Sequence, residues 1–457
     1  MTSIAQVIPQ DIIREIFVKV ADINTLGVRS RSYYTEAYPW YLGHVCSWWR
    51  TALLSTPPHK LFVSILEPEM SSRQAESTAS VVTYFLGLNR GRQFDLGIRY
   101  YCATQGCGWT DAISRIFGLL VAESSHWRHV TLGICLPCAV LRRCRLKYLP
   151  SMQSLRLEET SWRAIEIPSG DCRDCFTNTP SLTHVELSLT YYRDWEFDWS
   201  NLTYLHLGGT LFIKKQSIFL YLQQAINLDT LITGAVSTHF RARKERITLP
   251  RLQSWRAFDC YWLSFINAPA LKNLSVGFHG IYDNDIIINR DLVISFLCES
   301  DCKLARLTWN CTTKEPSVFS KILRLAPELV HIKLLGDSDI IAASIESLSA
   351  PIPGVVGSVF PVPRLRSLQI NLAYNQLTDR IINGLSKFLL FRNGQPASNG
   401  GRPAIVDQVK WLCVGKGTHC SEKHGVQDER LRRLCNAFSV ELPSPTDATF
   451  DEMLPIR

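Results

Sequence analysis

Hydrophobic residues recur along most of the chain in one short pattern, with apolar positions at offsets 2, 5 and usually 7 from a leading residue. Alternation of the last two apolar positions predicts a β-strand with one buried face. Successive copies begin about 19 to 36 residues apart, and helix-like segments with apolar spacings of three to four lie between them. The copies span residues 125–132, 150–157, 180–187, 200–207, 227–233, 250–257, 269–276, 302–309, 327–334 and 363–370.

The repeated segment has the L-x-x-L-x-L form of the strand in a leucine-rich repeat. A small hydrogen-bonding side chain tends to follow three residues later, as these repeats require where the chain leaves the strand. In successive repeats these residues are Cys135, Thr160, Thr190, Thr210, Cys260, Thr312 and Asp337. Each repeat can bury its apolar face only against its neighbours, so the array is expected to fold as one elongated unit. The expected fold class is therefore α/β, an irregular leucine-rich repeat solenoid with a curved parallel sheet and convex helices.

Two amphipathic helices are expected before the repeats. Pro9 suits a first helical position, and one apolar face of the first helix holds Ile12, Ile13, Ile16, Phe17 and Val20. Pro39 opens the second helix, whose apolar stripe is Leu42, Val45, Cys46, Trp49 and Leu53. Trp40 and Trp48 lie off that stripe, so aromatic surface is left over, which is typical of an interface. Packing of this surface against the following domain is the alternative.

The same residues resemble the F-box of fungal F-box proteins. Ile8-Pro9, Ile12-Ile13, Ile16-Phe17 and Val45-Cys46-x-x-Trp49-Arg50 follow its Leu-Pro, Ile-Leu, Ile-Phe and Val-Cys-x-x-Trp-Arg elements, of which the last is the most specific. Ile8 replaces the usual leucine, and the spacer over residues 21–38 is longer than usual. The resemblance implies a small all-α domain that docks the Skp adaptor and, through it, a cullin. The implied adaptor-binding residues are Ile8, Pro9, Ile12, Ile13, Ile16, Phe17, Val45, Cys46, Trp49 and Arg50.

Composition places the chain among globular proteins, since 46% of its 457 residues are hydrophobic and 20% are charged. The first ten residues show no signal-peptide pattern, and no apolar run approaches the ~20 residues of a membrane span. We therefore expect an intracellular protein of the cytoplasm or nucleus, with no membrane partner and with its fifteen cysteines reduced. The net charge of +8 is modest, and basic clusters at 142–147 and 241–246 are read as solvated surface, so no nucleic acid is expected.

Candidate chemistry is sparse. Two C-x-x-C pairs, Cys135–Cys138 and Cys172–Cys175, have His126 and His129 nearby, but the gap between them exceeds the ~15–20 residues of common zinc sites. No G-x-S-x-G, H-E-x-x-H or glycine-rich phosphate loop is found. His44 and Cys46, at i and i+2, cannot face one another on a helix. We expect no metal, no cofactor and no enzymatic activity.

Four segments are expected: an F-box at 5–62, a linker at 63–80, the repeats at 81–392, and a loop with a C-terminal cap at 393–457. The cap is predicted to hold a strand near 404–415 and a helix near 428–438.

Together these patterns predict the substrate-recognition subunit of a Skp–cullin–F-box ubiquitin ligase, which would raise the local concentration of a protein target. The alternatives are a scaffold acting outside a ligase and a repeat protein whose F-box is degenerate. An unknown protein target would contact the strand positions that alternate with the buried leucines. These are Arg156, His184, Glu186, Tyr204, His206, Arg256, Arg306, Thr308, His331, Lys333 and Gln369.

Overall fold

A computed structural model describes much of the chain and divides it into two compact units, Met1–Leu228 and Asp229–Arg457. Each unit is described by itself. The described residues are 8–20, 25–29, 45–54, 58–66, 72–101, 111–134, 148–158, 176–188, 197–208, 217–234, 246–277, 290–311, 316–350, 361–372, 377–393, 411–416 and 425–437.

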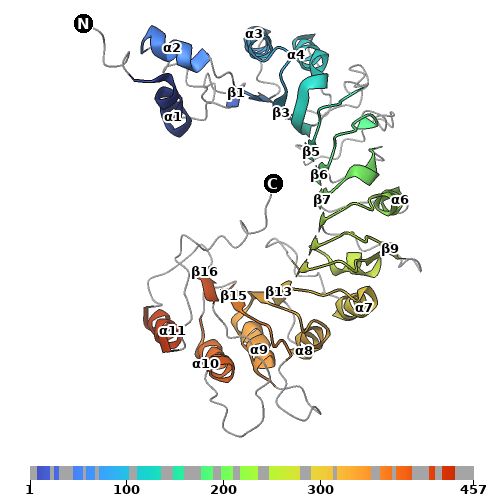
Figure 1. Ribbon diagram of the computed structural model, residues 1–457, viewed down its shortest axis with the longest axis vertical. Coiled ribbons are helices and arrows are strands. Elements are labelled where there is room, and N and C mark those ends of the chain that lie inside the picture. Colours follow the sequence, from blue (N-terminus) through green and yellow to red (C-terminus); the bar gives the residue numbers. More distant parts are fainter. Residues whose placement is uncertain are drawn as a thin grey trace. The chain divides into compact units, whose positions relative to one another are not determined.

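The first unit is built on a parallel sheet whose strands, β1 to β7, pair in chain order (Figure 1). Each strand adds to the edge left by the one before it, which is the connectivity of a repeat protein. Its elements are α1 (Gln10–Val20), β1 (Thr25–Arg29), α2 (Ser47–Leu54), β2 (Lys60–Leu66), α3 (Ser72–Leu88), β3 (Phe94–Tyr101), α4 (Asp111–Ala122), η3 (Ser124–His126), β4 (Trp127–Ile134), β5 (Ser154–Glu158), β6 (His184–Ser188), η5 (Trp199–Asn201), β7 (Tyr204–Gly208) and α6 (Ser217–Gln224).

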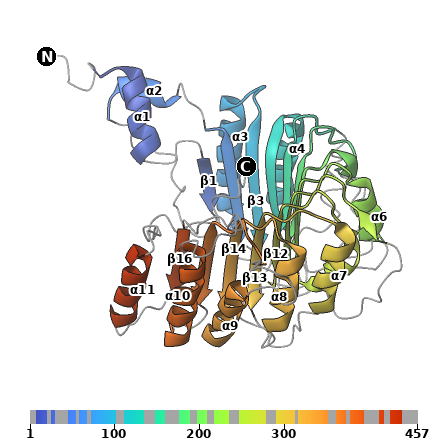
Figure 2. The same cartoon turned by 60° about the horizontal axis from the view of Figure 1, so that its bottom comes forward.

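The second unit repeats this plan in the order β8-β10-β12-β13-β14-β15-β16, again with all its described pairs parallel, and β9 pairs separately with β11. Helices α7 to α10 lie beside one another along one side of the sheet (Figure 2). Its elements are β8 (Thr230–Thr233), β9 (Ile247–Thr248), β10 (Ser254–Ala257), η6 (Cys260–Ser264), β11 (Ile266–Asn267), β12 (Asn273–Val276), α7 (Arg290–Ser300), β13 (Arg306–Cys311), α8 (Pro316–Leu325), β14 (His331–Gly336), α9 (Ser338–Ser349), β15 (Ser367–Leu372), α10 (Asp379–Asn393), β16 (Trp411–Lys416) and α11 (Gly425–Ala437).

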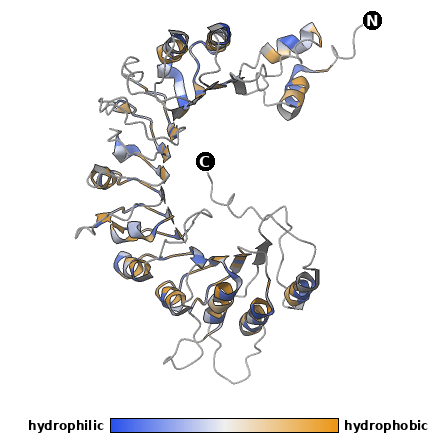
Figure 3. Ribbon diagram, turned by 180° about the vertical axis from the view of Figure 1, so that it is seen from behind, coloured by the Kyte–Doolittle hydropathy of each residue, from blue (hydrophilic) through white to orange (hydrophobic). Residues whose placement is uncertain are grey.

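The core of each unit lies between one face of the sheet and the apolar stripes of the helices. In β5, Leu155 and Leu157 are buried while Arg156 between them is exposed, as the period of two in a strand requires. Helix α8 buries Val318 and Ile322 at helical spacing. Figure 3 shows the hydrophobic and hydrophilic sides of such helices.

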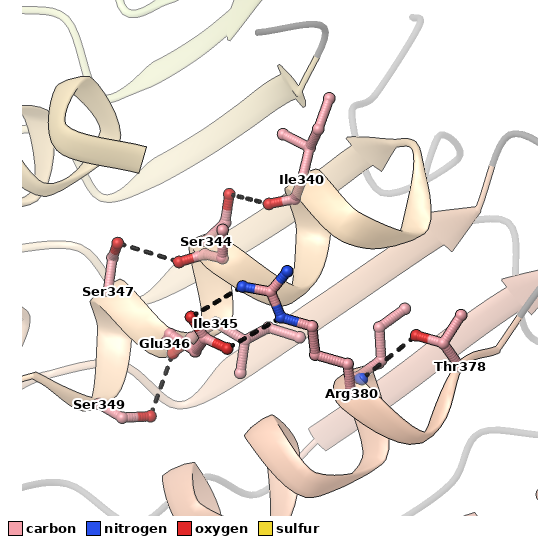
Figure 4. A network of polar contacts seen from close by, with 10 residues as sticks. Ile340, Ser344, Ile345, Glu346, Ser347, Ser349, Thr378 and Arg380 are labelled. Atoms are coloured by element: carbon pink, nitrogen blue, oxygen red, sulfur yellow. Dashed lines mark hydrogen bonds and ion pairs between the residues drawn. The ribbon is translucent and has the colours of Figure 1, made fainter. Parts of the chain in front are cut away.

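Ion pairs join neighbouring helices at the surface of the second unit. Glu346 of α9 accepts two hydrogen bonds from the Arg380 guanidinium of α10, at 3.1 and 3.2 Å (Figure 4). Asp379 of α10 pairs with Arg430 of α11 through a single contact. Because these side chains are exposed, each pair contributes little to stability.

The repeat pattern is confirmed, because all ten predicted copies contain a strand of the parallel sheets, β4 to β8, β10 and β12 to β15. The strand and helix predicted for the C-terminal cap are confirmed as β16 and α11. The residues expected where the chain leaves each strand lie mostly outside the described residues. Of the two that are described, Cys260 is buried in η6, and Asp337 precedes α9 without a side-chain capping bond.

The linker predicted at 63–80 is wrong. Residues 63–66 belong to strand β2, which pairs with β1 and β3, and α3 begins at Ser72. Strand β2 buries Leu61, Val63 and Ile65 in strict alternation. Its segment nevertheless lacks the apolar residue at offset 2 that the other copies carry. The N-terminal segment is therefore not all-α, since β1 lies between its two helices and continues the sheet.

The second predicted helix is shorter than expected. Helix α2 begins at Ser47, and Val45 and Cys46 precede it. The carbonyl of Cys46 accepts a hydrogen bond from the Arg50 amide at 3.0 Å, which places Cys46 at the N-terminal cap. Pro39, Trp40 and Leu42 lie outside the described residues.

Candidate interaction surfaces

The N-terminal helices α1 and α2 pack around one aromatic contact. Phe17 is fully buried and meets the ring of Trp49 edge-on, with centroids 5.3 Å apart. Ile13, one turn earlier, is equally buried. The indole N–H of Trp48 donates to the Ile8 carbonyl at 3.1 Å, which ties the segment before α1 to α2. A small closed core therefore exists within this helix pair.

Apolar side chains remain on the outside of the helix pair. Ile12 is 47% exposed, Val45 55% and Trp48 37%. The predicted adaptor-binding residues therefore divide. Ile13 and Phe17 are inside the pair, Ile8, Ile16, Cys46 and Trp49 are partly exposed, and Pro9, Ile12, Val45 and Arg50 are exposed. We call Ile12, Val45 and Trp48 the exposed apolar set. Trp48 was not among the predicted adaptor-binding residues. Its position off the helical stripe had nevertheless indicated that it is not needed in the core of the helix pair.

In the first unit, predicted target-binding residues lie together on the sheet face opposite the buried leucines. The register places Arg156, Glu186 and His206 side by side in one row, and Ser154, His184 and Tyr204 in the next. We call these two rows, with Glu158 and Arg99, the first polar face. Residues far apart in sequence meet here because parallel strands in register align the same repeat position.

The charges of the first polar face neutralise one another. Arg156 Nε lies 2.7 Å from Glu158 Oε1, and its Nη1 lies 3.4 Å from Glu186 Oε2. Arg99 Nε approaches the other Glu158 oxygen at 3.2 Å. The pKa of Glu186 is lowered because His206, 4.0 Å away, and Arg156 favour its ionised form. Glu186 therefore stays charged, and both glutamates lie against the arginines around them.

Burial favours the neutral form of two histidines on this side of the sheet, His184 and His129. His184 stacks on Tyr204 with centroids 5.6 Å apart, and its Nδ1 lies 2.8 Å from the Thr183 hydroxyl. Burial, and then the nearby His129, lower the pKa of His184. Burial also lowers the pKa of His129. At neutral pH His184 and His129 are therefore neutral, beside the ion pairs of the first polar face.

The second unit carries the remaining predicted contacts in two adjacent rows. One row runs from Arg256 through Ser275, Thr308 and Lys333 to Gln369, and the other from Asn273 through Arg306 and His331 to Ser367. We call these rows the second polar face.

Two predicted contacts on the second polar face are largely buried. Lys333 is only 9% exposed and Gln369 only 4%. The Gln369 amide donates to Asn371 Oδ1 at 3.3 Å. Strand alternation fixes the face on which a side chain lies, but it does not fix how much of that face solvent reaches.

In the part of the chain that the structure describes, no three His, Cys, Asp or Glu side chains gather as a metal site. The cysteines of the two C-x-x-C pairs lie outside it. None of its helices is long and apolar enough to cross a bilayer.

Comparisons with known proteins assign no family to the chain. No family model matches it, and no curated protein does. Among solved structures, a crystal structure of a Bacteroides fragilis protein matches at 9% identity, over 82% of this chain and 72% of that one, with a TM-score of 0.26. The fold described above therefore rests on the strands and helices of this chain itself.

Proposed function

We propose that this protein is the substrate-recognition subunit of a Skp–cullin–F-box ubiquitin ligase. Its helix pair α1–α2 docks the Skp adaptor, and its parallel-sheet repeats bind a protein target. The observation that carries the proposal is the exposed apolar set, Ile12, Val45 and Trp48, on a helix pair whose own core is already filled by Phe17 and Trp49. A partner surface is the natural cover for apolar residues that the pair itself does not bury.

The resemblance to the F-box supplies the identity of that partner. Ile8-Pro9 and Val45-Cys46-x-x-Trp49-Arg50, the two ends of the resembling pattern, are brought together by the bond from Trp48 to Ile8. The repeats supply the second half of the function. Parallel strands in register present rows of polar side chains, and mixed donors, acceptors and charges of this kind suit a protein target.

Co-purification with a Skp adaptor tests the docking step. We expect the intact protein to elute with the adaptor as a one-to-one complex. Because an aspartate at the centre of an apolar interface remains unpaired, Ile12→Asp combined with Trp48→Ala should abolish the complex. The matched control is Leu220→Asp on α6, since Leu220 is 52% exposed and lies outside the helix pair.

The outcomes separate the proposal from its alternatives. Failure of the intact protein to bind the adaptor would refute docking and leave a repeat protein with a degenerate F-box. Equal loss in the Leu220→Asp control would show that the effect is not specific to the exposed apolar set. Adaptor binding without cullin recruitment would favour the scaffold alternative.

A further inference from the structure

The helix pair α1–α2 follows the repeat plan of the first unit. Each of its helices precedes a strand, α1 before β1 and α2 before β2, as α3 precedes β3. The connections are of similar length, since residues 21–24 lead into β1, residues 55–59 into β2 and residues 89–93 into β3. Strands β1 and β2 pair in parallel, as β2 and β3 do. In chain order and in strand pairing, the two helices therefore belong to helix–strand units of the array itself.

The β1–β2 pairing attaches the helix pair to the sheet at two points. All five residues of β1 lie in register with β2, from Thr25 opposite Lys60 to Arg29 opposite Ser64. Because β1 follows α1 and β2 follows α2, each helix is connected directly to a strand of the sheet. A movement of the pair about one connection would therefore have to break the strand pairing at the other.

A buried asparagine holds the chain just before β2. Asn89, which follows α3, is 4% exposed, and its side-chain amide donates to the Pro58 carbonyl at 2.8 Å and to the Phe85 carbonyl at 3.1 Å. The next carbonyl, that of His59, accepts from the Asp95 amide at 2.7 Å. Buried polar groups lose free energy when they lose their partners. These bonds therefore fix the connection from α2 to β2 against α3 and β3.

Side-chain packing locks β2 against β3. The Phe62 ring of β2 covers Gly97 of β3, where a Cβ would lie 2.5 Å from the ring. The Arg99 guanidinium lies over the same ring, 5.4 Å from its centroid. Arg99 also pairs with Glu158 of β5, 3.2 Å away. The strand that carries α2 is therefore connected by side chains to the middle of the first sheet.

The same sheet carries the first polar face. Both the helix pair and this face belong to the first unit. One row of the register runs unbroken from β2 to β7, through Phe62, Gly97, Thr131, Arg156, Glu186 and His206. Two sites on one continuous sheet keep their distance and direction, whereas sites on domains joined by a flexible linker move relative to one another.

We propose that the helix pair α1–α2 and strands β1 to β7 form one rigid body, in which the β1–β2 pairing and Asn89 fix the direction of the helix pair from the first polar face. This inference deepens the proposed function and rests on it for the identity of the adaptor, but not for the rigidity. A docked adaptor would then stand at a set position from a target bound on the sheet. Only target lysines within reach of the ubiquitin carrier would be modified, because reaction requires proximity and orientation.

Single-molecule energy transfer in the full-length protein, without adaptor, tests the rigidity. Dyes are attached through azidophenylalanine in place of Arg14 on α1 and Arg115 on α4, two exposed residues of the first unit. We expect one narrow distribution of transfer efficiency in the intact protein. Val28→Pro combined with Arg29→Pro should broaden it at least about twofold, because proline lacks the N–H that strand pairing uses.

A second variant leaves the strands unchanged. Asn89→Ala removes the donor to Pro58 and should broaden the distribution in the same direction. Its matched control is Arg90→Ala, since Arg90 is the next residue and is exposed. Val28→Ala with Arg29→Ala, which keeps both backbone N–H groups, is the control for the proline variant. Both controls should leave the distribution narrow. Unchanged circular dichroism shows that broadening reports motion and not unfolding.

Three results would overturn the inference: a broad distribution in the intact protein, a distribution left narrow by the proline variant or by Asn89→Ala, or equal broadening by Arg90→Ala. Adaptor co-purification with the same unlabelled protein separates the two proposals. A narrow distribution without adaptor binding refutes the docking proposal alone. A broad distribution with adaptor binding refutes this inference alone.

Discussion

Replacing Phe17 with alanine is expected to unfold the helix pair α1–α2 while the parallel sheet stays folded. Phe17 is fully buried, and truncation of a buried phenylalanine costs about 3–5 kcal/mol. That figure includes the edge-to-face contact with Trp49, worth about 0.5–1.5 kcal/mol. The helices have 11 and 8 residues, shorter than the ~12–15 at which an isolated helix becomes even marginally stable. Their stability therefore depends on the contact that this substitution removes.

Hydrogen exchange followed by mass spectrometry measures this effect segment by segment. In Phe17→Ala, we expect peptides from α1 and α2 to lose protection, and peptides from β5 to β7 to keep it. The matched control is Ile12→Ala, on the same helix but 47% exposed, which should leave protection in α1 almost unchanged. Undiminished protection of α1 in Phe17→Ala, or an equal loss in β5 to β7, would refute the reasoning.

Adaptor binding by Phe17→Ala and by Ile12→Asp distinguishes the inside of the helix pair from its outside. Phe17→Ala should weaken adaptor binding through loss of the helices, whereas Ile12→Asp should weaken it with the helices intact. If both variants bound the adaptor normally, the helix pair would not be the docking site.

Three further outcomes are expected. Gly97→Ala should destabilise the first unit by about 1–3 kcal/mol in urea denaturation, because the new Cβ would lie 2.5 Å from the Phe62 ring, and Phe62→Ala in the same chain should relieve much of that cost. Burial lowers the pKa of His184, so its neutral form stabilises the fold at neutral pH; the unfolding free energy should fall as pH drops below about 6.5, and His184→Gln should flatten that part of a melting-temperature profile. Burial raises the pKa of Cys302 to about 11, so N-ethylmaleimide at pH 7.5 should modify exposed Cys298 in the native protein and Cys302 only after unfolding, as peptide mass spectrometry would show.

Most of the parallel sheet could be predicted from sequence because its signal is local. In β5 to β7 and β12 to β15, the leucine, valine and isoleucine positions that alternate along the chain are those that the fold buries. Strand β3 was missed for a physical reason. Phe94, Leu96 and Ile98 alternate regularly, but Gln93 stands three residues before Leu96, where the other copies have an apolar residue.

The first half of helix α3 was missed because small side chains form its buried side. Ala75, Thr78 and Ala79 are buried at helical spacing, and small residues of this kind read as a polar linker in composition. Residues with little hydrophobic signal can still line a packed helix face where another element approaches closely. That close approach is a tertiary property, which one-dimensional patterns do not contain.

The polar faces show a different limit of sequence reasoning. Alternation placed Arg156, Glu186 and His206 on one face, but only the register brought them side by side. The exposure of Lys333 depends on what lies over the strand, and no pattern within the strand encodes that.

The charge of a polar face depends on the whole row of residues aligned across the strands. It cannot be read from any one strand segment of the sequence. Parallel strands in register collect one residue from each repeat, so residues about 20 to 30 positions apart decide together whether a row is neutral or charged. Arg156 stands at offset 6 of its copy and Arg306 at offset 4, so both lie on the strand face that alternates with the buried leucines. In the fold, two glutamates neutralise Arg156, whereas Arg306 adjoins asparagine and histidine. The net charge of +8 cannot distinguish these two arginines. Their different neighbours therefore give the two arginines different electrostatic surroundings among the described residues.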